Sequence, residues 1–323
     1  MNTITLTDIE AAVERIGKRV RRTPCLRSRF IREPLRAGPT MLKLECLQVT
    51  GAFKVRGANN AILQLDDATR ARGVITASGG NHGIAVAYAA HASASPAVVY
   101  LPENVPGDKA ERIRAWGAEV VVEGAGWDDA EEAALARAER DNLAYIHPFA
   151  DPAVIAGQGT IGREMLKQSP EIDIMVAGVG GGGMIAGIAI AAKAIKPGIK
   201  VIGVEPVGAP TLSRSLDAGK LVTLDSIETG ANTLAPRRSA ELNFGIIREL
   251  VDEIVLVSDE EMRRAAEWLW FEMGQAVELA GAAAVAAIQT GKVEAPDDVT
   301  VAAVVCGNGT AAISGLNAAW PDG

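Results

Sequence analysis

The sequence predicts an α/β protein with open, parallel-rich sheets flanked by helices and divided into two lobes. A length of 323 residues is too great for one small core. Short apolar segments alternate with helix-patterned segments along most of the chain, as in βαβ units. Aromatic residues make up only 4% of the chain, so the core is expected to consist of Val, Ile, Leu and Ala, which suits buried parallel strands.

The elements follow from apolar spacing and capping residues. The first helix is expected to start at the capping residue Thr7, because Ile9, Val13, Ile16 and Val20 recur at helical spacing. The strands predicted after it are residues 41–45, 73–77, 97–101, 119–122, 172–179, 200–204 and 299–305. The predicted helices are residues 58–65, 83–91, 107–116, 127–141, 153–167, 184–195, 258–273 and 282–288.

Residues 145–152 form a proline-bearing bridge between two runs of strand–helix alternation. We therefore expect a small mobile lobe of residues 66–149, inserted into a large lobe of residues 1–65 and 150–323. Residues 206–236 are the least regular long stretch and are expected to form a loop over the site.

Composition excludes several classes of protein. The net charge is −8 and no basic stripe is present, which argues against nucleic-acid binding. Cys25, Cys46 and Cys306 are odd in number and lack CxxC spacing, so we expect neither a disulfide framework nor structural zinc, and we expect a reducing compartment, the cytoplasm. No signal-peptide pattern begins the chain and no uncharged run reaches the ~18 residues of a membrane span, so no membrane association is expected.

Three glycine-rich turns follow predicted strands, at residues 78–83, 178–183 and 306–310. In open α/β sheets, ligands bind beyond the carboxyl ends of the strands, so these turns are expected to converge. The four consecutive glycines Gly180–Gly183 precede a helix near Met184 and carry an entropic cost that a plain turn does not require. Their amides and the positive end of the helix dipole predict a phosphate site.

The same turn permits a second interpretation. Residues 178–183 match the GxGxxG pattern of dinucleotide-binding proteins, and Glu205 ends the next strand, where a ribose-binding acid would lie. An NAD-dependent dehydrogenase is therefore an alternative. It accounts for one turn of three and leaves Lys54 and Asn81 without roles.

Lys54 lies between Gly51 and Gly57, next to the apolar Phe53. A lysine in such a partly desolvated position has a lowered pKa, as amine nucleophiles require. Asn81 lies in the first glycine turn, where it is either a turn residue or a hydrogen-bonding group.

The motifs, taken in order, resemble the fold-type II pyridoxal phosphate (PLP) enzymes, whose architecture is tryptophan synthase β-like. The resemblance covers roughly residues 8–316 and is specific to the serine/threonine dehydratase and serine racemase group. The segments that carry it are residues 51–57, 78–83, 155–160, 180–183 and 306–309.

The resemblance implies roles for individual residues. Lys54 would hold PLP covalently and act as the base at the substrate Cα. The cofactor would also be bound by Phe53, Asn81, Gly180, Gly181, Gly182, Gly183, Met184 and Cys306, with Asn81 at the ring hydroxyl and Cys306 at the pyridine nitrogen. The substrate carboxylate would be held by Ser78, Gly79, Gly80 and His82.

The implied reaction is dehydration and deamination of an L-β-hydroxy amino acid, threonine or serine, to a 2-keto acid and ammonia, by a homodimer. Residues 229–234 differ from the usual run of threonine dehydratases, so 3-hydroxyaspartate and phenylserine remain alternative substrates. Residues 278–281 resemble a Glu-Pro-Ala-Gly run without its proline, which puts Glu278 near the cofactor.

Departures from the family pattern refine the expectation. Gly79 stands where racemases of the group have a serine, so we expect no efficient racemisation, and Phe149 stands where racemases have an asparagine. The divalent-cation site of the group is matched by Glu205 and Ala209, but Thr211 stands in place of its second acid, so the cation remains an open question.

Overall fold

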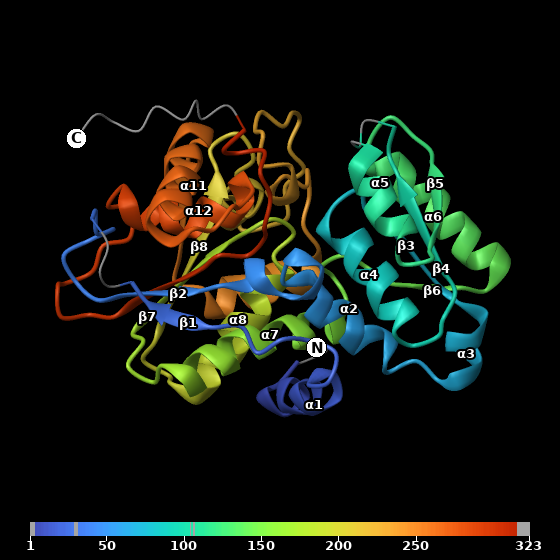
Figure 1. Cartoon of the computed structure of the whole chain (residues 1–323), viewed down its shortest axis with the longest axis horizontal. Coiled ribbons are helices and arrows are strands. Elements are labelled where there is room, and N and C mark those ends of the chain that lie inside the picture. Colours follow the sequence, from blue (N-terminus) through green and yellow to red (C-terminus); the bar gives the residue numbers. More distant parts are fainter. Residues whose placement is uncertain (1–3, 29–31, 104, 106, 315–323) are drawn as a thin grey trace.

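The computed structural model describes residues 4–28, 32–103, 105 and 107–314, and it contains two sheets side by side (Figure 1). The larger sheet has six strands in the order β1-β2-β10-β7-β8-β9. All of its neighbouring strands are parallel except β1 and β2, which are antiparallel. The strands are β1 (Cys25–Arg27), β2 (Thr40–Lys43), β7 (Ile174–Gly178), β8 (Lys200–Pro206), β9 (Glu253–Val257) and β10 (Val301–Val304).

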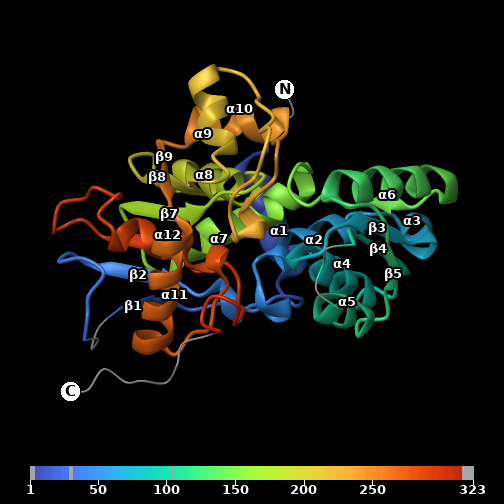
Figure 2. The same cartoon turned by 90° about the horizontal axis from the view of Figure 1, so that it is seen from above.

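The second sheet has four parallel strands in the order β5-β4-β3-β6. They are β3 (Val74–Ala77), β4 (Ala97–Leu101), β5 (Glu119–Val122) and β6 (Ala144–Tyr145). Helices α4 (Asn81–His91), α5 (Gly107–Arg114) and α6 (Trp127–Asp141) pack with this sheet, and the short helix α3 (Asp67–Arg72) precedes β3. Figure 2 shows these helices grouped apart from the rest.

Helices cover both faces of the larger sheet (Figure 1). One face packs against α11 (Asp259–Met273) and α12 (Leu279–Gln289). The other packs against α7 (Pro152–Gln168) and α8 (Gly183–Ile195). The remaining helices are α1 (Leu6–Ile16), α2 (Lys54–Ile62), α9 (Thr211–Ala218) and α10 (Glu241–Leu250), with short 3₁₀ turns η1 (Glu45–Leu47), η2 (Val49–Gly51) and η3 (Asn232–Leu234).

The α/β class and the parallel-rich sheets are as predicted, but several elements differ. Thr5, not Thr7, caps the first helix, because the Thr5 side chain accepts from the Asp8 amide, and the helix ends at Ile16. Helix α2 begins at Lys54 instead of residue 58. Residues 206–236 are not simply a loop, since they contain α9 and η3. The sequence patterns also missed β1, α3, α10 and β9, which are short or rely on contacts with distant segments.

No helix in the described part of the chain is long and apolar enough to cross a membrane. All three cysteines have free thiols, with Cys46 and Cys306 buried.

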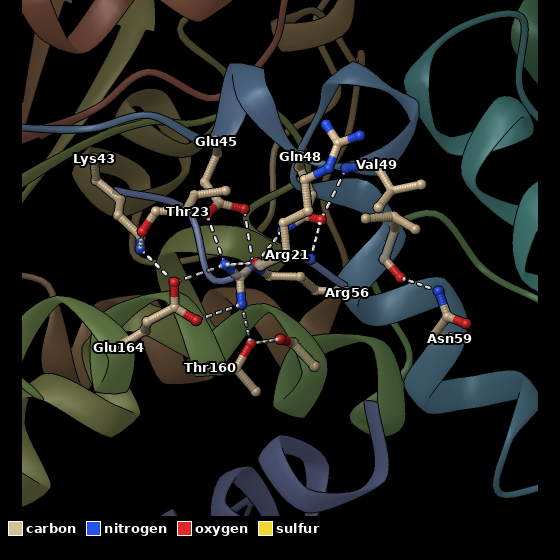
Figure 3. Close-up of polar contacts among 12 residues, drawn as sticks. Arg21, Thr23, Lys43, Glu45, Gln48, Val49, Arg56, Asn59, Thr160 and Glu164 are labelled. Atoms are coloured by element: carbon tan, nitrogen blue, oxygen red, sulfur yellow. Dashed lines mark hydrogen bonds and ion pairs between the residues drawn. The ribbon is translucent and has the colours of Figure 1, made fainter. Parts of the chain in front are cut away.

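A buried cluster of charged side chains joins the start of α2 to β2, η1 and α7 (Figure 3). Arg56 donates from Nε to Glu45 Oε2 at 2.7 Å and from Nη2 to Glu45 Oε1 at 2.8 Å. It also donates to Glu164 Oε2 at 3.2 Å, and Lys43 Nζ donates to Glu164 Oε1 at 2.5 Å. The side chains of Arg56 and Glu45 are 1% and 0% exposed. The four residues, which we call the Arg56 cluster, pair two cations with two anions.

Replacement of Arg56 by alanine is expected to lower the free energy of unfolding by about 3–5 kcal/mol, because Glu45 would remain buried without its partner. The measurement is urea unfolding followed by circular dichroism. The matched control is Arg114→Ala, which removes an exposed ion pair with Glu111 and is expected to cost less than about 1 kcal/mol. Equal losses in the two variants would show that the Arg56 cluster does not support the fold.

Candidate active site

Lys54 begins helix α2 and is only partly exposed. Its Nζ donates to the Pro148 carbonyl at 2.8 Å and lies 5.2 Å from the centre of the Phe53 ring. Burial lowers the pKa of Lys54 to about 8, although the nearby Cys306 and Glu278 act in the opposite direction. A larger fraction of this amine is therefore neutral near pH 7 than for an ordinary lysine, as a nucleophile or base requires.

The third glycine turn holds the segment that carries Lys54. The Phe53 amide donates to the Cys306 carbonyl at 3.1 Å, and Ala52 forms a bridge with Gly307. Gly51 has a φ of +84°, and a Cβ at this position would lie 2.4 Å from the Asn308 side chain, so glycine is required by both conformation and space. The start of α2 is thus fastened to the end of β10.

The second glycine turn forms the N-terminus of α8. Gly182 is the N-cap residue with a φ of +90°, and the helix runs from Gly183 through Met184. A Cβ at Gly181 would lie 2.2 Å from the Phe149 ring, and one at Gly180 would lie 2.9 Å from the Thr233 carbonyl. Because the first amides of a helix have no partner within it, this glycine turn fits a phosphate group.

The first glycine turn meets the other two through Glu278 and Thr233. Asn81 Nδ2 donates to Glu278 Oε1 at 2.7 Å, and Thr233 Oγ1 donates to the same oxygen at 3.3 Å. Burial raises the pKa of Glu278, while the hydrogen bond from Asn81 lowers it. A Cβ at Gly307 would lie 2.7 Å from Glu278 Oε1. The three turns therefore converge, as their positions after strands predicted.

The remaining residues of the first turn lie at the carboxyl end of β3. The Gly80 amide donates to Ser78 Oγ at 3.3 Å. His82 Nε2 lies 3.0 Å from the Ile146 carbonyl, and burial lowers the pKa of His82 to about 3, so its ring is neutral. Its Nδ1 is buried and has no hydrogen-bond partner among the described residues. A Cβ at Gly79 would lie 2.1 Å from Val105 Cγ2.

Cys306 follows β10 and presents a neutral thiol. Its Sγ donates to the Ala280 carbonyl at 3.3 Å, and burial raises its pKa far above neutrality. The Cys306 thiol is therefore a neutral polar group in the interior around Lys54.

Glu205 lies near the end of β8 and Ala209 follows that strand, but they do not fit a divalent cation. The two Glu205 oxygens each accept at 2.8 Å, from the amides of Leu212 and Ser213. Thr211 donates its hydroxyl to the Pro236 carbonyl. Across the residues that the structure describes, no three His, Cys, Asp or Glu side chains are grouped to hold a metal.

Sequence reasoning did not assign three contributors to this arrangement. Pro148 and His147 were assigned only to the bridge between lobes, yet the Pro148 carbonyl accepts from Lys54 and the His147 ring contacts Phe149. Thr233 was known only as part of residues 229–234. Backbone carbonyls carry no sequence signal, so the Pro148 contact required the tertiary structure.

A buried amine of lowered pKa, connected through Pro148 and Phe149 to a glycine turn that fits a phosphate group, is an arrangement that suits a phosphorylated aldehyde held through an amine. The chain belongs to the pyridoxal-phosphate dependent enzyme family, whose sequence model matches residues 16–307. The predicted family is thereby confirmed, and PLP, not a dinucleotide, is the cofactor that the family implies for this chain.

Individual relatives cover most of the chain. It is 40% identical over 285 residues to an L-threonine ammonia-lyase of Thermotoga maritima, which covers 88% of this chain and 71% of that protein. An L-threonine ammonia-lyase of Geobacter sulfurreducens is 42% identical over 94% of this chain and 75% of its own length. The solved structure of maize serine racemase has a TM-score of 0.90 and 35% identity, covering 94% of this chain and 93% of that one.

His82 is expected to make stability depend on pH. Its pKa of about 3 in the folded protein lies below the unfolded value of about 6.5, so the unfolded state gains a proton first as pH falls. The contribution of His82 to the free energy of unfolding is therefore at its maximum above pH ~6.5. It falls by on the order of a few kcal/mol as the pH is lowered to ~4.

Glu205 affects the pH dependence of stability in the opposite direction. Burial raises its pKa to about 7, so its contribution to the free energy of unfolding is lost as pH rises. We therefore compare the free energies of unfolding of the natural protein and of His82→Gln, measured by urea denaturation from pH 4 to pH 7, and follow the difference between them. The difference is expected to shrink as pH falls. A constant difference over this range would contradict the assignment of a neutral buried His82.

Proposed function

We propose that the protein is a PLP-dependent ammonia-lyase that dehydrates and deaminates an L-β-hydroxy amino acid, with L-threonine or L-serine as substrate, to a 2-keto acid and ammonia. The observation that carries the proposal is the buried Lys54 amine, with its pKa of about 8, which donates to the Pro148 carbonyl next to Phe149, the residue packed against the Gly180–Gly183 turn. The two L-threonine ammonia-lyases at 40% and 42% identity support this choice of reaction.

The residues that would hold PLP surround Lys54. Lys54 would bind the cofactor aldehyde, and the Gly180–Gly183 turn with the Met184 amide would bind the phosphate. Asn81, whose side-chain amide also donates to Glu278, would donate to the ring hydroxyl, and Phe53 and Cys306 would contribute to binding the ring. When bound, PLP supplies an electron sink for negative charge at the substrate Cα.

The protein's own groups orient the substrate and move its proton. The backbone and hydroxyl of the Ser78–His82 turn bind the substrate carboxylate, since this turn follows the carboxyl end of β3 and contains Asn81. Lys54 takes the proton from Cα, and its lowered pKa keeps it competent as a base near neutral pH. Burial raises the pKa of Cys306, so this residue would offer the cofactor ring a neutral thiol and no ionic partner, which suits elimination of the β-hydroxyl.

Keto-acid release from L-threonine and L-serine tests the function. The purified protein with PLP is expected to release 2-keto acid and to show the visible absorbance of the bound cofactor. Lys54→Ala is expected to lose at least ~10³-fold in rate together with that absorbance, because no other amine occupies its place. The exposed Lys220→Ala is the control and keeps both.

Release from neither amino acid would contradict the proposed substrates. In that case, activity on 3-hydroxyaspartate or phenylserine in the same assay would keep the reaction class and replace the substrate.

Gly79 and Val105 are expected to keep racemisation low. A serine at position 79 would meet Val105 Cγ2 at 2.1 Å, so Gly79→Ser alone is expected to gain little D-serine formation. Gly79→Ser combined with Val105→Ala removes the obstruction and is expected to form D-serine at least ~10-fold faster than the natural protein. The assay is chiral chromatography of L-serine incubations. Efficient D-serine formation by the natural protein would contradict the proposal, and Val105→Ala alone is the matched control.

We further propose that residues 66–149 move as a small lobe relative to residues 1–65 and 150–323. The four-stranded sheet lies in the first range and the six-stranded sheet in the second, which supports separate bodies. Closure of the first body over the second would shield the site from water during proton transfer.

Assembly and location are likewise proposals. A homodimer is supported by exposed apolar side chains on the larger lobe, including Leu26, Leu47 and Trp270. A cytoplasmic location is supported by three unpaired cysteines. We assign no step to a divalent cation, because the Glu205 carboxylate is already occupied by two amides.

A further inference from the structure

The segment from Ile146 to Asp151 joins β6 of the small sheet to α7 of the large lobe. At its start, the Ile146 amide donates to Ile75 at 2.9 Å, and its carbonyl lies 3.0 Å from His82 Nε2. At its end, Asp151 Oδ1 accepts from the Ala153 amide at 2.6 Å and caps α7. Both ends of this crossing segment are therefore anchored, one in each lobe.

The middle of the crossing segment touches both halves of the active site. The Pro148 carbonyl accepts from Lys54 Nζ at 2.8 Å. The Phe149 ring lies against Gly181, where a Cβ would come within 2.2 Å of it. The Phe149 carbonyl accepts from Asn243 Nδ2 at 3.0 Å, and the same amide group donates to the Gly181 carbonyl at 2.6 Å. Two adjacent residues thus contact the catalytic lysine and the phosphate turn.

His147 sets the shape of this segment. Its Nδ1 accepts from the Phe149 amide at 3.1 Å and from the Ala150 amide at 2.9 Å. Its ring meets the Phe149 ring edge-on, with centroids 4.6 Å apart. The acceptor role of Nδ1 puts the ring proton on Nε2, which lies 3.8 Å from Glu131 Oε1. Tyr145 donates to that same carboxylate at 2.8 Å.

We propose that His147 is a positioning residue of this enzyme: by accepting the Phe149 and Ala150 amides, it holds the Pro148 carbonyl against Lys54 and the Phe149 ring against Gly181. This role rests on the proposed PLP chemistry of Lys54. His147 touches neither the reacting atoms nor the phosphate turn itself, and it acts through Pro148 and Phe149.

The surroundings keep His147 in the state that the role requires. Burial lowers the pKa of His147 to about 4, with Lys54 adding to the effect, so Nδ1 is free to accept at neutral pH. Glu131 and Tyr145 face the ring from the small lobe, and burial raises the pKa of Glu131, so a smaller fraction of this carboxyl is ionised to stabilise a positive charge on the His147 ring. His82 also lies close enough for its pKa to be lowered by His147.

The test compares His147→Asn with His147→Ala. Asparagine Oδ1 occupies the position of histidine Nδ1 along the side chain and can accept the same two amides, whereas alanine cannot. Glu131→Gln is the matched control, because it changes the contacts of Glu131 with His147 Nε2 and Tyr145 but leaves Nδ1 and its two amide donors in place.

The first readout is hydrogen exchange of the Phe149 and Ala150 amides in the protein without added PLP. The second is the dissociation constant for PLP, followed by visible absorbance. We expect His147→Ala to raise both the exchange rate and the dissociation constant by ~10-fold or more, since the two amides lose their acceptor. His147→Asn and Glu131→Gln are expected to stay within ~3-fold of the natural protein in both.

Keto-acid kinetics provide a third readout. We expect His147→Ala to lower kcat by ~10-fold or more while changing KM less than ~3-fold, because the carboxylate-binding turn is untouched. Unaltered exchange and PLP binding in His147→Ala would overturn the proposal. Equal impairment of His147→Asn and His147→Ala would also overturn it, because the ring would then matter for packing instead of hydrogen bonding. If the natural protein releases no keto acid, the proposed function fails, while exchange and PLP binding still decide the role of His147.

Discussion

The active site depends on the buried ion pairs between Arg56 and the two carboxylates Glu45 and Glu164. Charges are costly to bury unless they are paired and hydrogen-bonded, and here Lys43 completes a group of two cations and two anions. The pairs connect η1, α2 and α7, elements that are far apart in the sequence (Figure 3). Because Lys54 precedes Arg56 by two residues on α2, the same pairs determine where the lysine amine lies.

Burial acts on the site in a second way, by favouring neutral forms. It lowers the pKa of Lys54 to about 8, lowers that of His82 to about 3 and raises that of the Cys306 thiol. An amine base, a neutral imidazole and a thiol therefore surround the place where PLP is proposed to bind. In such a weakly polar interior, a few well-placed groups would determine how strongly charge that develops on the substrate is stabilised. The Glu278 carboxyl, hydrogen-bonded to Asn81, is the acidic exception, and burial raises its pKa as well.

Gly79 and, near Glu205, Thr211 are two of the positions at which this chain departs from the pattern of its group. Gly79 has no side chain, and Val105 fills the space that a serine there would need. The Glu205 carboxyl accepts hydrogen bonds from the amides at the start of α9, so it stabilises the N-terminal end of that helix without a metal. Both differences concern the surroundings of the site. The lysine, the glycine turns and the thiol are the residues on which the resemblance to the family was based, and the family model matches the chain from residue 16 to residue 307.

The sequence by itself determined the α/β class, the parallel sheets and the family, because these follow from periodic burial and from glycine turns after strands. Local patterns also located Lys54, Asn81 and the Gly180–Gly183 turn, which the structure brings together. Only the tertiary structure decided that the Pro148 carbonyl meets Lys54, that His147 accepts two amides, and that Val105 covers Gly79. These contacts join segments that are distant in sequence or use backbone atoms that every residue possesses, so no side-chain pattern can encode them.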